Sequence, residues 1–357
     1  KTKSWEELKN HFNKIKGTSI SDFFVNDPNR FKNFSINYRG LLLDFSRNRI
    51  NDETLDIFEK LSEEIKLSDA IRSYFNGEKI NETEGRGVLH TAVRNQSNNK
   101  LIHDGVNIIE KIKTERERVF KFSNEIITGN YLGFSGKKIS TIVNVGIGGS
   151  DLGPKMVTEA LEFYRNHLNI KFISNVDGDH IHGLLKFLDP ETTLFIIVSK
   201  SFKTQETLTN GETIKEWFIE KANKDAVSKH FVAVSNNLDK IKDFGISSDK
   251  IFAMNDWVGG RFSLWSSAGI TIALAIGQDN FKELLSGAQE VDCHFKTAKF
   301  RDNIPKILAM IGVWYTNFWN AETEAVVPYT EYLRSLPAYL QQSVMESNGK
   351  SVNREGK

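Results

Sequence analysis

Segment 199–204 places three hydroxyl side chains and two ammonium groups within six residues, directly after an apolar run. It reads SKSFKT, and the hydroxyls belong to Ser199, Ser201 and Thr204. Hydroxyls and free backbone amides at a helix N-terminus bind a phosphate dianion without a metal, and the ammonium group of Lys200 adds a point charge. If Thr204 only capped the following helix, that would explain one hydroxyl but not three. The segment therefore predicts a phosphate site.

A glycine-rich segment, 146–153, is the second candidate. It reads GIGGSDLG and also follows an apolar run. Its glycines let a ligand approach the backbone, and the amides that begin the next helix favour an anion. A dinucleotide fingerprint needs glycine at 151, where this chain has Asp151, although Asp177 follows the next apolar run as a ribose-binding carboxylate would. Anion binding, nucleotide binding and a turn that only packs helix on strand all stay open.

Two further segments bring charged groups next to glycines. Segment 256–263 reads DWVGGRFS, and its Gly-Gly turn presents Arg261. A guanidinium there would stabilise an oxyanion or a phosphate, unless it is a surface side chain paired with Asp256.

Glu346 lies near the end of an expected helix, two residues before an Asn-Gly pair. A carboxylate in that position would act as a general base or would be a solvated helix end.

Histidines and acidic residues elsewhere give weaker signals. Segment 177–182 reads DGDHIH, which suggests a metal site, but no further cluster of Cys or His supplies the other ligands. We interpret Asp177 as a turn and helix cap, and His90 as a structural residue. The sequence therefore predicts neither a metal nor a cofactor.

Alternating strands and helices position these segments. Five short, β-branched apolar runs are expected to be strands, at 140–147, 170–176, 193–199, 231–235 and 250–254. Helical patterns separate most of them, at 153–164, 180–187 and 204–221. Continuous apolar strands alternating with helices indicate a buried parallel sheet covered on both faces. We predict an α/β fold with a doubly wound parallel sheet over residues 120–278, whose ligands bind at the carboxyl ends of the strands.

The flanking regions are expected to be mostly helical. Residues 1–119 form the N-terminal region, with helical patterns at 4–16, 52–67 and, running on into the sheet domain, 97–128. Residues 279–357 are predicted to be a helical connector, with helices at 281–295 and 304–318, followed by the start of a second α/β unit. That start consists of a strand at 324–328 and a helix at 337–346.

Composition limits the classes of function. The chain has 357 residues, enough for two or three domains, and 47 Lys and Arg balance 46 Asp and Glu, which argues against a dedicated nucleic-acid binder. A single cysteine, Cys293, excludes a disulfide-built secreted fold and favours the cytoplasm. The longest apolar runs fall far short of the ~20 residues of a membrane helix, and the first residues contain no apolar signal-peptide core.

Taken together, the motifs resemble the glucose-6-phosphate isomerase family, which is built from two sugar-isomerase (SIS-type) α/β domains. The matching segments are 144–154, 199–207, 257–266 and 341–350, in the family's order, and 85–95 is also similar to the family's N-terminal segment. The resemblance implies that Glu346, Arg261 and Lys200 are catalytic, with Glu346 moving the proton. The substrate-binding residues that it implies are Gly149, Ser150, Ser199, Lys200, Ser201, Thr204, Gly260, Arg261 and Gln342.

By this resemblance the activity is interconversion of glucose 6-phosphate and fructose 6-phosphate through a cis-enediolate, in glycolysis and gluconeogenesis. The family also implies a homodimer, and a ring-opening His and a catalytic Lys that lie beyond Lys357, so we expect residues 1–357 to hold only part of the active site. A non-catalytic sugar-phosphate sensor on the same fold is the alternative, because a fold does not fix a function. A nicotinamide-dependent oxidoreductase comes third, disfavoured by Asp151.

Overall fold

The computed structural model describes residues 2–357, apart from the side chain of Ser347, and the chain forms two compact units. One unit comprises Lys1–Asn76 and Gln289–Ala325, and the other comprises Gly77–Ala288 and Val326–Lys357. Each unit is therefore built from two separate stretches of the sequence. All of the candidate site residues belong to the second unit.

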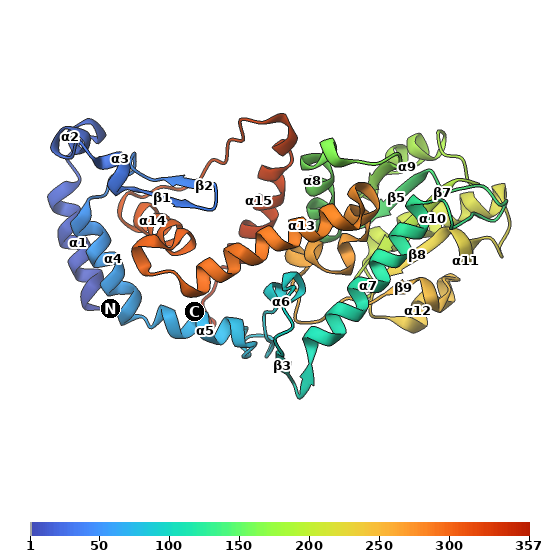
Figure 1. Cartoon of the computed structure of the whole chain (residues 1–357), viewed down its shortest axis with the longest axis horizontal. Helices are drawn as coiled ribbons and strands as arrows, with labels where there is room; N and C mark the ends of the chain where they lie inside the picture. The colour runs from blue at the N-terminus through green and yellow to red at the C-terminus, as the bar shows by residue number, and fades with distance from the viewer. Residues whose placement is uncertain (1) are drawn as a thin grey trace. The chain divides into compact units, whose positions relative to one another are not determined.

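A five-stranded parallel sheet forms the centre of the second unit (Figure 1), as predicted. Its spatial order is β6-β5-β7-β8-β9, so the chain moves outward from β5 to β6 and then crosses back to β7. The strands are β5 (Thr141–Val145), β6 (Asn169–Ile173), β7 (Thr193–Val198), β8 (Phe231–Val234) and β9 (Ile251–Phe252). The strands before and after this crossing are added on opposite sides of β5. The gap between β5 and β7 is therefore the switch point at which such sheets bind ligands.

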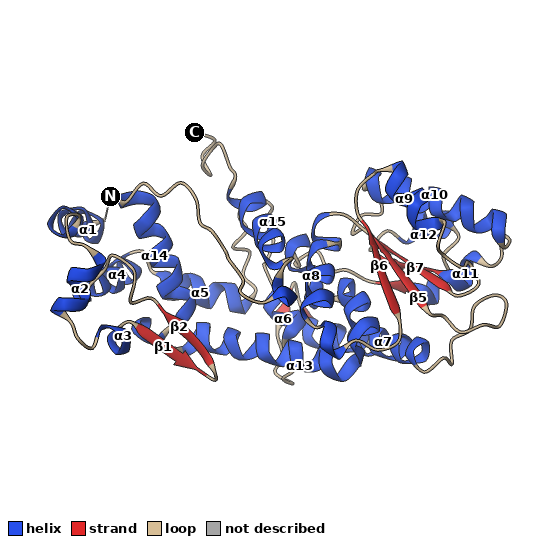
Figure 2. Ribbon diagram, turned by 90° about the horizontal axis from the view of Figure 1, so that it is seen from above, coloured by secondary structure: helices blue, strands red, loops and turns tan. Residues whose placement is uncertain are grey.

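Helices cover both faces of this sheet (Figure 2), because its strands are apolar on both sides and all six residues of β7 are buried. One face packs against α9 (Gly178–Leu185), α10 (Gln205–Lys221), α11 (Val227–His230) and α12 (Leu238–Phe244). The other face packs against α7 (Ile108–Ile127), α8 (Leu152–Ala160) and α13 (Ile270–Thr297).

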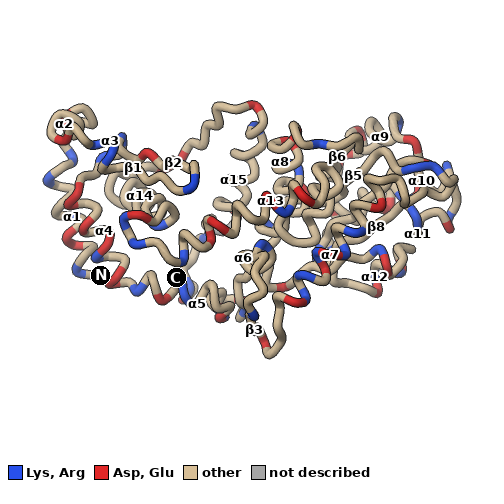
Figure 3. Tube along the Cα trace, in the orientation of Figure 1, with Lys and Arg blue, Asp and Glu red and all other residues tan. Residues whose placement is uncertain are grey.

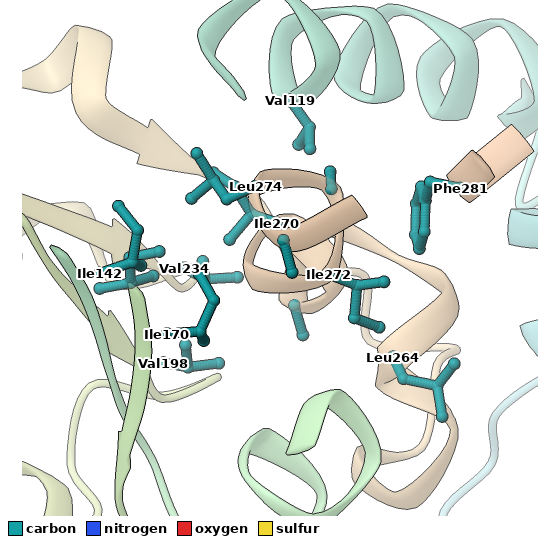
Figure 4. Packing of buried hydrophobic residues seen from close by; sticks show 14 of the residues in the cluster. Val119, Ile142, Ile170, Val198, Val234, Leu264, Ile270, Ile272, Leu274 and Phe281 are labelled. Atoms are coloured by element: carbon teal, nitrogen blue, oxygen red, sulfur yellow. The ribbon is translucent and has the colours of Figure 1, made fainter. Parts of the chain in front are cut away.

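Helix α13 supplies much of the second face's core. Figure 4 shows Ile270 and Leu274 of α13 between Ile142 and Val234 of the sheet and Val119 of α7, and all five side chains are buried. The helix has 28 residues and bends at Gly277, whose φ of 79° is outside the helical range. The predicted helix at 281–295 is only its second part, because the earlier part is apolar all round and carries no amphipathic pattern.

Helices also dominate the first unit, around the buried Trp314. A short hairpin of β1 (Ser35–Tyr38) and β2 (Leu41–Asp44) packs with them. The helices are α1 (Lys3–Ile15), α2 (Ile20–Asn26), α3 (Arg30–Asn33), α4 (Asp52–Glu64), α5 (Leu67–Asn76) and α14 (Ile304–Phe318). The compact units thus differ from the predicted regions 1–119, 120–278 and 279–357, because residues 289–325 return to the N-terminal helices. Their boundaries at 119 and 278 fall inside α7 and α13.

Three predicted elements need correction. The helix predicted at 52–67 ends at Glu64, because Lys66 adopts a positive φ of 56° that stops the helix before α5. The helix predicted at 97–128 begins only at Ile108 and follows a hairpin of β3 (Ile102–His103) and β4 (Val106–Asn107). The strand predicted at 324–328 is wrong: these residues form neither a strand nor a bridge in the described chain, and Val327 is 67% exposed.

Charge is spread evenly over the chain. Figure 3 shows basic and acidic residues interspersed along the trace, in keeping with the net charge of +1. No helix in the described part of the chain is long and apolar enough to span a membrane.

Candidate active site

Residues 199–204, here called the hydroxyl loop, follow β7 at the switch point of the sheet. Ser199 is 2% exposed, and its backbone N–H donates to Val234 O of β8 at 3.1 Å, which continues the ladder past the strand. Its hydroxyl oxygen lies 3.0 Å from Thr204 Oγ1. Thr204 is the N-cap of the 17-residue α10, but within the described chain its side chain makes no capping hydrogen bond. Capping alone therefore does not explain this residue.

Backbone contacts hold the same loop in place. Phe202 has a φ of 49° and is buried against Phe244 at a ring distance of 5.8 Å, so it anchors the middle of the loop. Lys200 O accepts hydrogen bonds from Asn236 N at 3.0 Å and Ser235 Oγ at 3.1 Å. Ser201, by contrast, is exposed. The loop is thus a fixed platform beside the N-terminus of α10.

The glycine-rich segment follows β5 and meets the hydroxyl loop. A Cβ added at Gly146 would lie 2.8 Å from Ser150 Cβ and 3.1 Å from Val198 O, so glycine lets Ser150 sit against the end of β7. Asn144 Nδ2 of β5 donates to Ser150 O at 3.0 Å, and Thr271 Oγ1 donates to Asn144 Oδ1 at 2.8 Å. Ser150 is therefore held next to the residue that precedes Ser199.

Gly149 permits a close contact between two short 3-10 helices, η1 (Gly148–Ser150) and η4 (Gly260–Trp265). A Cβ at Gly149 would lie 2.1 Å from Gly260 O and 2.7 Å from Arg261 N, so no other residue fits there without moving the backbone. Ser263 Oγ also donates to Gly149 O at 3.3 Å. The glycine-rich loop thus positions the Gly-Gly-Arg turn directly.

Arg261 faces Glu346 across this contact. Its Nη1 donates to Glu346 Oε2 at 3.0 Å, and the side chains are 29% and 57% exposed, so the pair is open to a ligand. Glu346 lies in α15 (Leu336–Asn348), and Tyr339 OH of the same helix donates to Arg261 O at 3.1 Å. The alternative pairing of Arg261 with Asp256 is wrong, because Asp256 contacts Lys200 instead.

Gln342 of α15 completes this side of the site. Its Nε2 would lie 3.4 Å from a Cβ at Gly148, which places the amide over the glycine-rich loop. Gln342 Oε1 and Arg261 Nε are both buried and have no hydrogen-bond partner among the described residues. Buried polar atoms normally have partners, so these two are available to a polar ligand.

Lys200 has contacts that the sequence did not indicate. Its ammonium group donates to Asp256 O at 3.0 Å and to Val258 O at 3.4 Å, and it lies 3.4 Å from Asp256 Oδ1. The ammonium group of Lys200 therefore contacts the loop that leads to Gly260 and Arg261. No spacing rule in the sequence connects residues 200 and 256, so this contact could not have been found there.

Two buried titratable groups border the site. His90 stacks on Phe262 at a ring distance of 4.1 Å, and burial, together with Arg94 and Arg261, lowers the pKa of His90 to about 3. It is therefore a neutral structural residue. Asp151 is 4% exposed, and burial raises the pKa of its carboxyl to about 6. Its Oδ1 has no hydrogen-bond partner in the described chain.

Neither segment 177–182 nor any other part of the described chain groups three or more His, Cys, Asp or Glu side chains in a way that could hold a metal ion. Asp177 is the N-cap of α9, as predicted, and its Oδ1 accepts from Asp179 N at 3.0 Å and His180 N at 3.4 Å. This carboxylate therefore caps the N-terminus of α9 by accepting from its first backbone N–H groups.

The arrangement combines a hydroxyl loop, a guanidinium and a carboxylate at the carboxyl edge of a doubly wound sheet. Residues 44–357 match the family model described as phosphoglucose isomerase. The chain belongs to the phosphoglucose isomerase family.

Similar proteins of known sequence bear the name glucose-6-phosphate isomerase. The glucose-6-phosphate isomerase of Christiangramia forsetii is 53% identical over 355 residues, covering 99% of this chain and 65% of the relative. That of Wigglesworthia glossinidia brevipalpis is 52% identical over 358 residues, covering 100% of this chain and 65% of the relative. The chain thus spans slightly less than two thirds of these phosphoglucose isomerase family members.

Among solved structures, a glucose-6-phosphate isomerase from Chlamydia trachomatis superposes with a TM-score of 0.89 at 32% identity, covering 100% of this chain and 68% of that one. This likeness confirms the predicted family fold, an α/β architecture with a doubly wound parallel sheet of the SIS type.

Proposed function

We propose that the protein containing this chain interconverts glucose 6-phosphate and fructose 6-phosphate. The observation that carries the proposal is the Arg261–Glu346 pair, 3.0 Å apart, next to the hydroxyl loop at the switch point of the sheet. Relatives at 52–53% identity bear the name glucose-6-phosphate isomerase. The pair supplies a base and a cation, and the loop supplies a phosphate anchor.

In this proposal the substrate's phosphate binds the hydroxyl loop. Ser199, Ser201 and Thr204 donate hydrogen bonds to it, Ser150 donates from the glycine-rich loop, and the amides at the N-terminus of α10 add their dipole. Lys200 contributes positive charge while its contact with residues 256–258 keeps the loops in register. A fixed phosphate holds the sugar carbons at a constant distance from Glu346.

Proton transfer would then use Glu346 and Arg261. Glu346 removes the hydrogen from carbon 2 of the aldose as a proton, which leaves an enediolate, and delivers a proton to carbon 1. The hydroxyl proton of oxygen 2 passes to oxygen 1, so the aldehyde becomes an alcohol and the alcohol becomes a ketone. The guanidinium of Arg261 stabilises the negative charge that develops on the oxygens of these two carbons. Gln342, Gly149 and Gly260 line the space around the reacting atoms. One proton moves between adjacent carbons with no net redox change, so we propose no cofactor.

The same family membership leads us to propose a homodimer in the cytoplasm, with a small sugar phosphate as the ligand. The family resemblance supports the homodimer and the ligand, and the lone cysteine supports the cytoplasm.

The test is a reaction of the native-length protein with fructose 6-phosphate in deuterated water, followed by proton NMR. We expect glucose 6-phosphate to accumulate with deuterium at carbon 2. Saturable binding without conversion would instead favour a non-catalytic sensor. Fluorescence titration with nicotinamide cofactors is the control for an oxidoreductase, and saturable cofactor binding would contradict the proposal.

A further inference from the structure

A second cleft lies at the carboxyl edge of the same sheet, above β8 and β9. Its volume is about 560 Å³, which is within the range of small-molecule sites. One wall consists of residues that follow β8 and β9, namely Asn236 and 253–257. The other wall comes from segment 79–111, which includes the β3–β4 hairpin. The carboxyl ends of parallel strands are where doubly wound sheets bind ligands.

This cleft is distinct from the candidate active site. The active-site groups sit on the loops after β5 and β7 and on η4 and α15, and none of the proposed phosphate-binding hydroxyls lines the cleft. In the strand order β6-β5-β7-β8-β9, the cleft occupies the far side of β7 from β5. The two sites are therefore neighbours, and Asp256 in the wall of the cleft also contacts Lys200.

The lining of the cleft is charged and carries an excess of cations. It includes Lys79, Arg86 and Lys111 against two acidic residues, Asp104 and Asp256. Lys79 lies 3.3 Å from Asp104 and Arg86 lies 2.7 Å from Glu84, but the ammonium group of Lys111 has no ion-pair partner among the described residues. An anion would satisfy this cation, and carboxylates nearby would accept hydrogen bonds from hydroxyl groups.

An aromatic side chain and an imidazole complete the lining. Trp257 is half-buried in the wall that follows β9, and its backbone O accepts from Leu89 N at 2.9 Å, which fixes its position. His103 Nδ1 lies 3.0 Å from Gly77 O, which orients the ring. An indole face packs well against the C–H face of a polyol.

We infer that this cleft binds a small hydroxylated organic phosphate as an effector. Lys111 would hold the phosphate, with Arg86 as a second donor beside its pair with Glu84. Asp104 and Asp256 would accept hydrogen bonds from the hydroxyl groups, and Trp257 would cover the carbon skeleton. The binding itself does not depend on the proposed isomerase activity, because it uses none of the residues assigned to that activity.

Asp256 links the cleft to the hydroxyl loop. Its backbone O accepts from Arg86 Nη1 at 3.2 Å and from Lys200 Nζ at 3.0 Å, so one carbonyl serves both sites. An anion that draws Arg86 away would change the contact that holds Lys200. Occupancy of the cleft therefore alters affinity at the hydroxyl loop, and the effect is reciprocal. This coupling rests on the proposed function of that loop.

The test uses the native-length protein and glycerol 3-phosphate as the probe, with binding followed by isothermal titration calorimetry and by tryptophan fluorescence. We expect two classes of site. Lys111→Ala weakens one class by about tenfold or more, because a charge-assisted contact is lost. Lys121→Ala, an exposed lysine on the same helix, is the matched control and leaves both classes unchanged. Trp257→Phe removes the fluorescence response of the cleft class only.

Three results would overturn the inference: a single class of site, no effect of Lys111→Ala, or a fluorescence response that disappears in Ser199→Ala and persists in Lys111→Ala. Thermal melting shows whether each variant is folded, and a second variant, Lys111→Gln, replaces Lys111→Ala if the latter unfolds. If the unmodified native-length protein binds the probe in the cleft but shows no isomerase activity, the proposed function is contradicted and the cleft inference is not.

Discussion

Asp151 is a buried carboxyl beside a residue of the candidate phosphate site, and its raised pKa has a cost. Between the unfolded pKa of 3.8 and the folded value of about 6, the folded protein holds a proton that the unfolded chain releases. The free energy of unfolding therefore falls as the pH rises through this window and stays lower above it. A buried group kept at such a cost is typical of functional sites.

We expect Asp151→Asn to raise the free energy of unfolding at pH 8 by about 2 kcal/mol, because the amide carries no charge to bury. At pH 4 the gain should be much smaller, since the wild-type carboxyl is then protonated in the fold. Urea unfolding at both pH values measures the difference. An equal gain at pH 4 and pH 8 would contradict the raised pKa.

Gly149 supports a second prediction at this scale. Gly149→Ala forces a Cβ to within 2.1 Å of Gly260 O, so η1 and η4 must separate. We expect a loss of about 1–3 kcal/mol in the free energy of unfolding and a clear loss of turnover. Gly183→Ala in α9 is the control, because a Cβ there meets nothing within 4 Å and should be neutral or stabilising. Similar behaviour of the two variants would refute the close contact.

Single residues were predictable where their chemistry is local. Asp177 was predicted as a helix cap, and Ser199 and Thr204 as partners in one loop, because capping and short loops depend on nearby residues only. The contact of Lys200 with Asp256 was not predictable, since the two residues are 56 positions apart and meet only through the pairing of β7 with β8 and β9.

At the scale of elements, α15 connects the candidate base to the candidate cation. Tyr339 is 8% exposed and belongs to the core beneath the site, and its hydroxyl donates to Arg261 O. The helix thus carries Glu346 on one turn and holds the backbone of Arg261 from another. A shift of α15 would change the distance between the two charged groups.

Tyr339→Phe tests this connection. The variant keeps the ring but loses one hydrogen bond, and we expect about 1 kcal/mol less stability. We also expect a lower kcat with little change in KM, because the hydroxyl loop, which holds the phosphate in the proposed function, is unaffected. Tyr329→Phe, at an exposed tyrosine, should change neither quantity. An unchanged kcat in Tyr339→Phe would show that α15 does not position Arg261.

Helices and strands were predictable where the pattern of apolar residues is strong and a strand is buried on both faces. The five buried strands were found because their residues are apolar on both faces, as in β7. The β3–β4 hairpin was missed, although Asp104 and Gly105 with φ of 47° and 77° form the Asp-Gly turn that favours hairpins. Segment 324–328 has the apolar composition of a strand, but a strand also requires a neighbour with which to pair.

At the scale of the whole molecule, the chain leaves the sheet unit along α13 and returns to the N-terminal helices. Residues 289–325 then pack around Trp314 with side chains from α1 and α4, such as Leu8 and Phe58. These contacts span more than 200 residues of sequence. Amphipathic patterns identify the helices but not their partners, so the sequence could not have revealed this arrangement.

The central claim is that Glu346 is the base of an isomerase whose phosphate site lies elsewhere. Glu346→Gln keeps size and hydrogen bonding but removes basicity, and loss of a general base lowers rates by ~10²–10⁴-fold. Affinity for the sugar phosphate should survive, because it resides in the loops after β5 and β7. Glu331→Gln is the control, since that exposed glutamate pairs only with Arg334 in the described chain.

The measurement follows the native-length Glu346→Gln variant in deuterated water, with isomerisation, hydrogen exchange at carbon 2 and the substrate dissociation constant determined on the same sample. We predict that both reactions collapse together while the dissociation constant stays within a few-fold, equivalent to about 1 kcal/mol. Near-normal exchange at carbon 2 would contradict the account, because the base would then be a different residue.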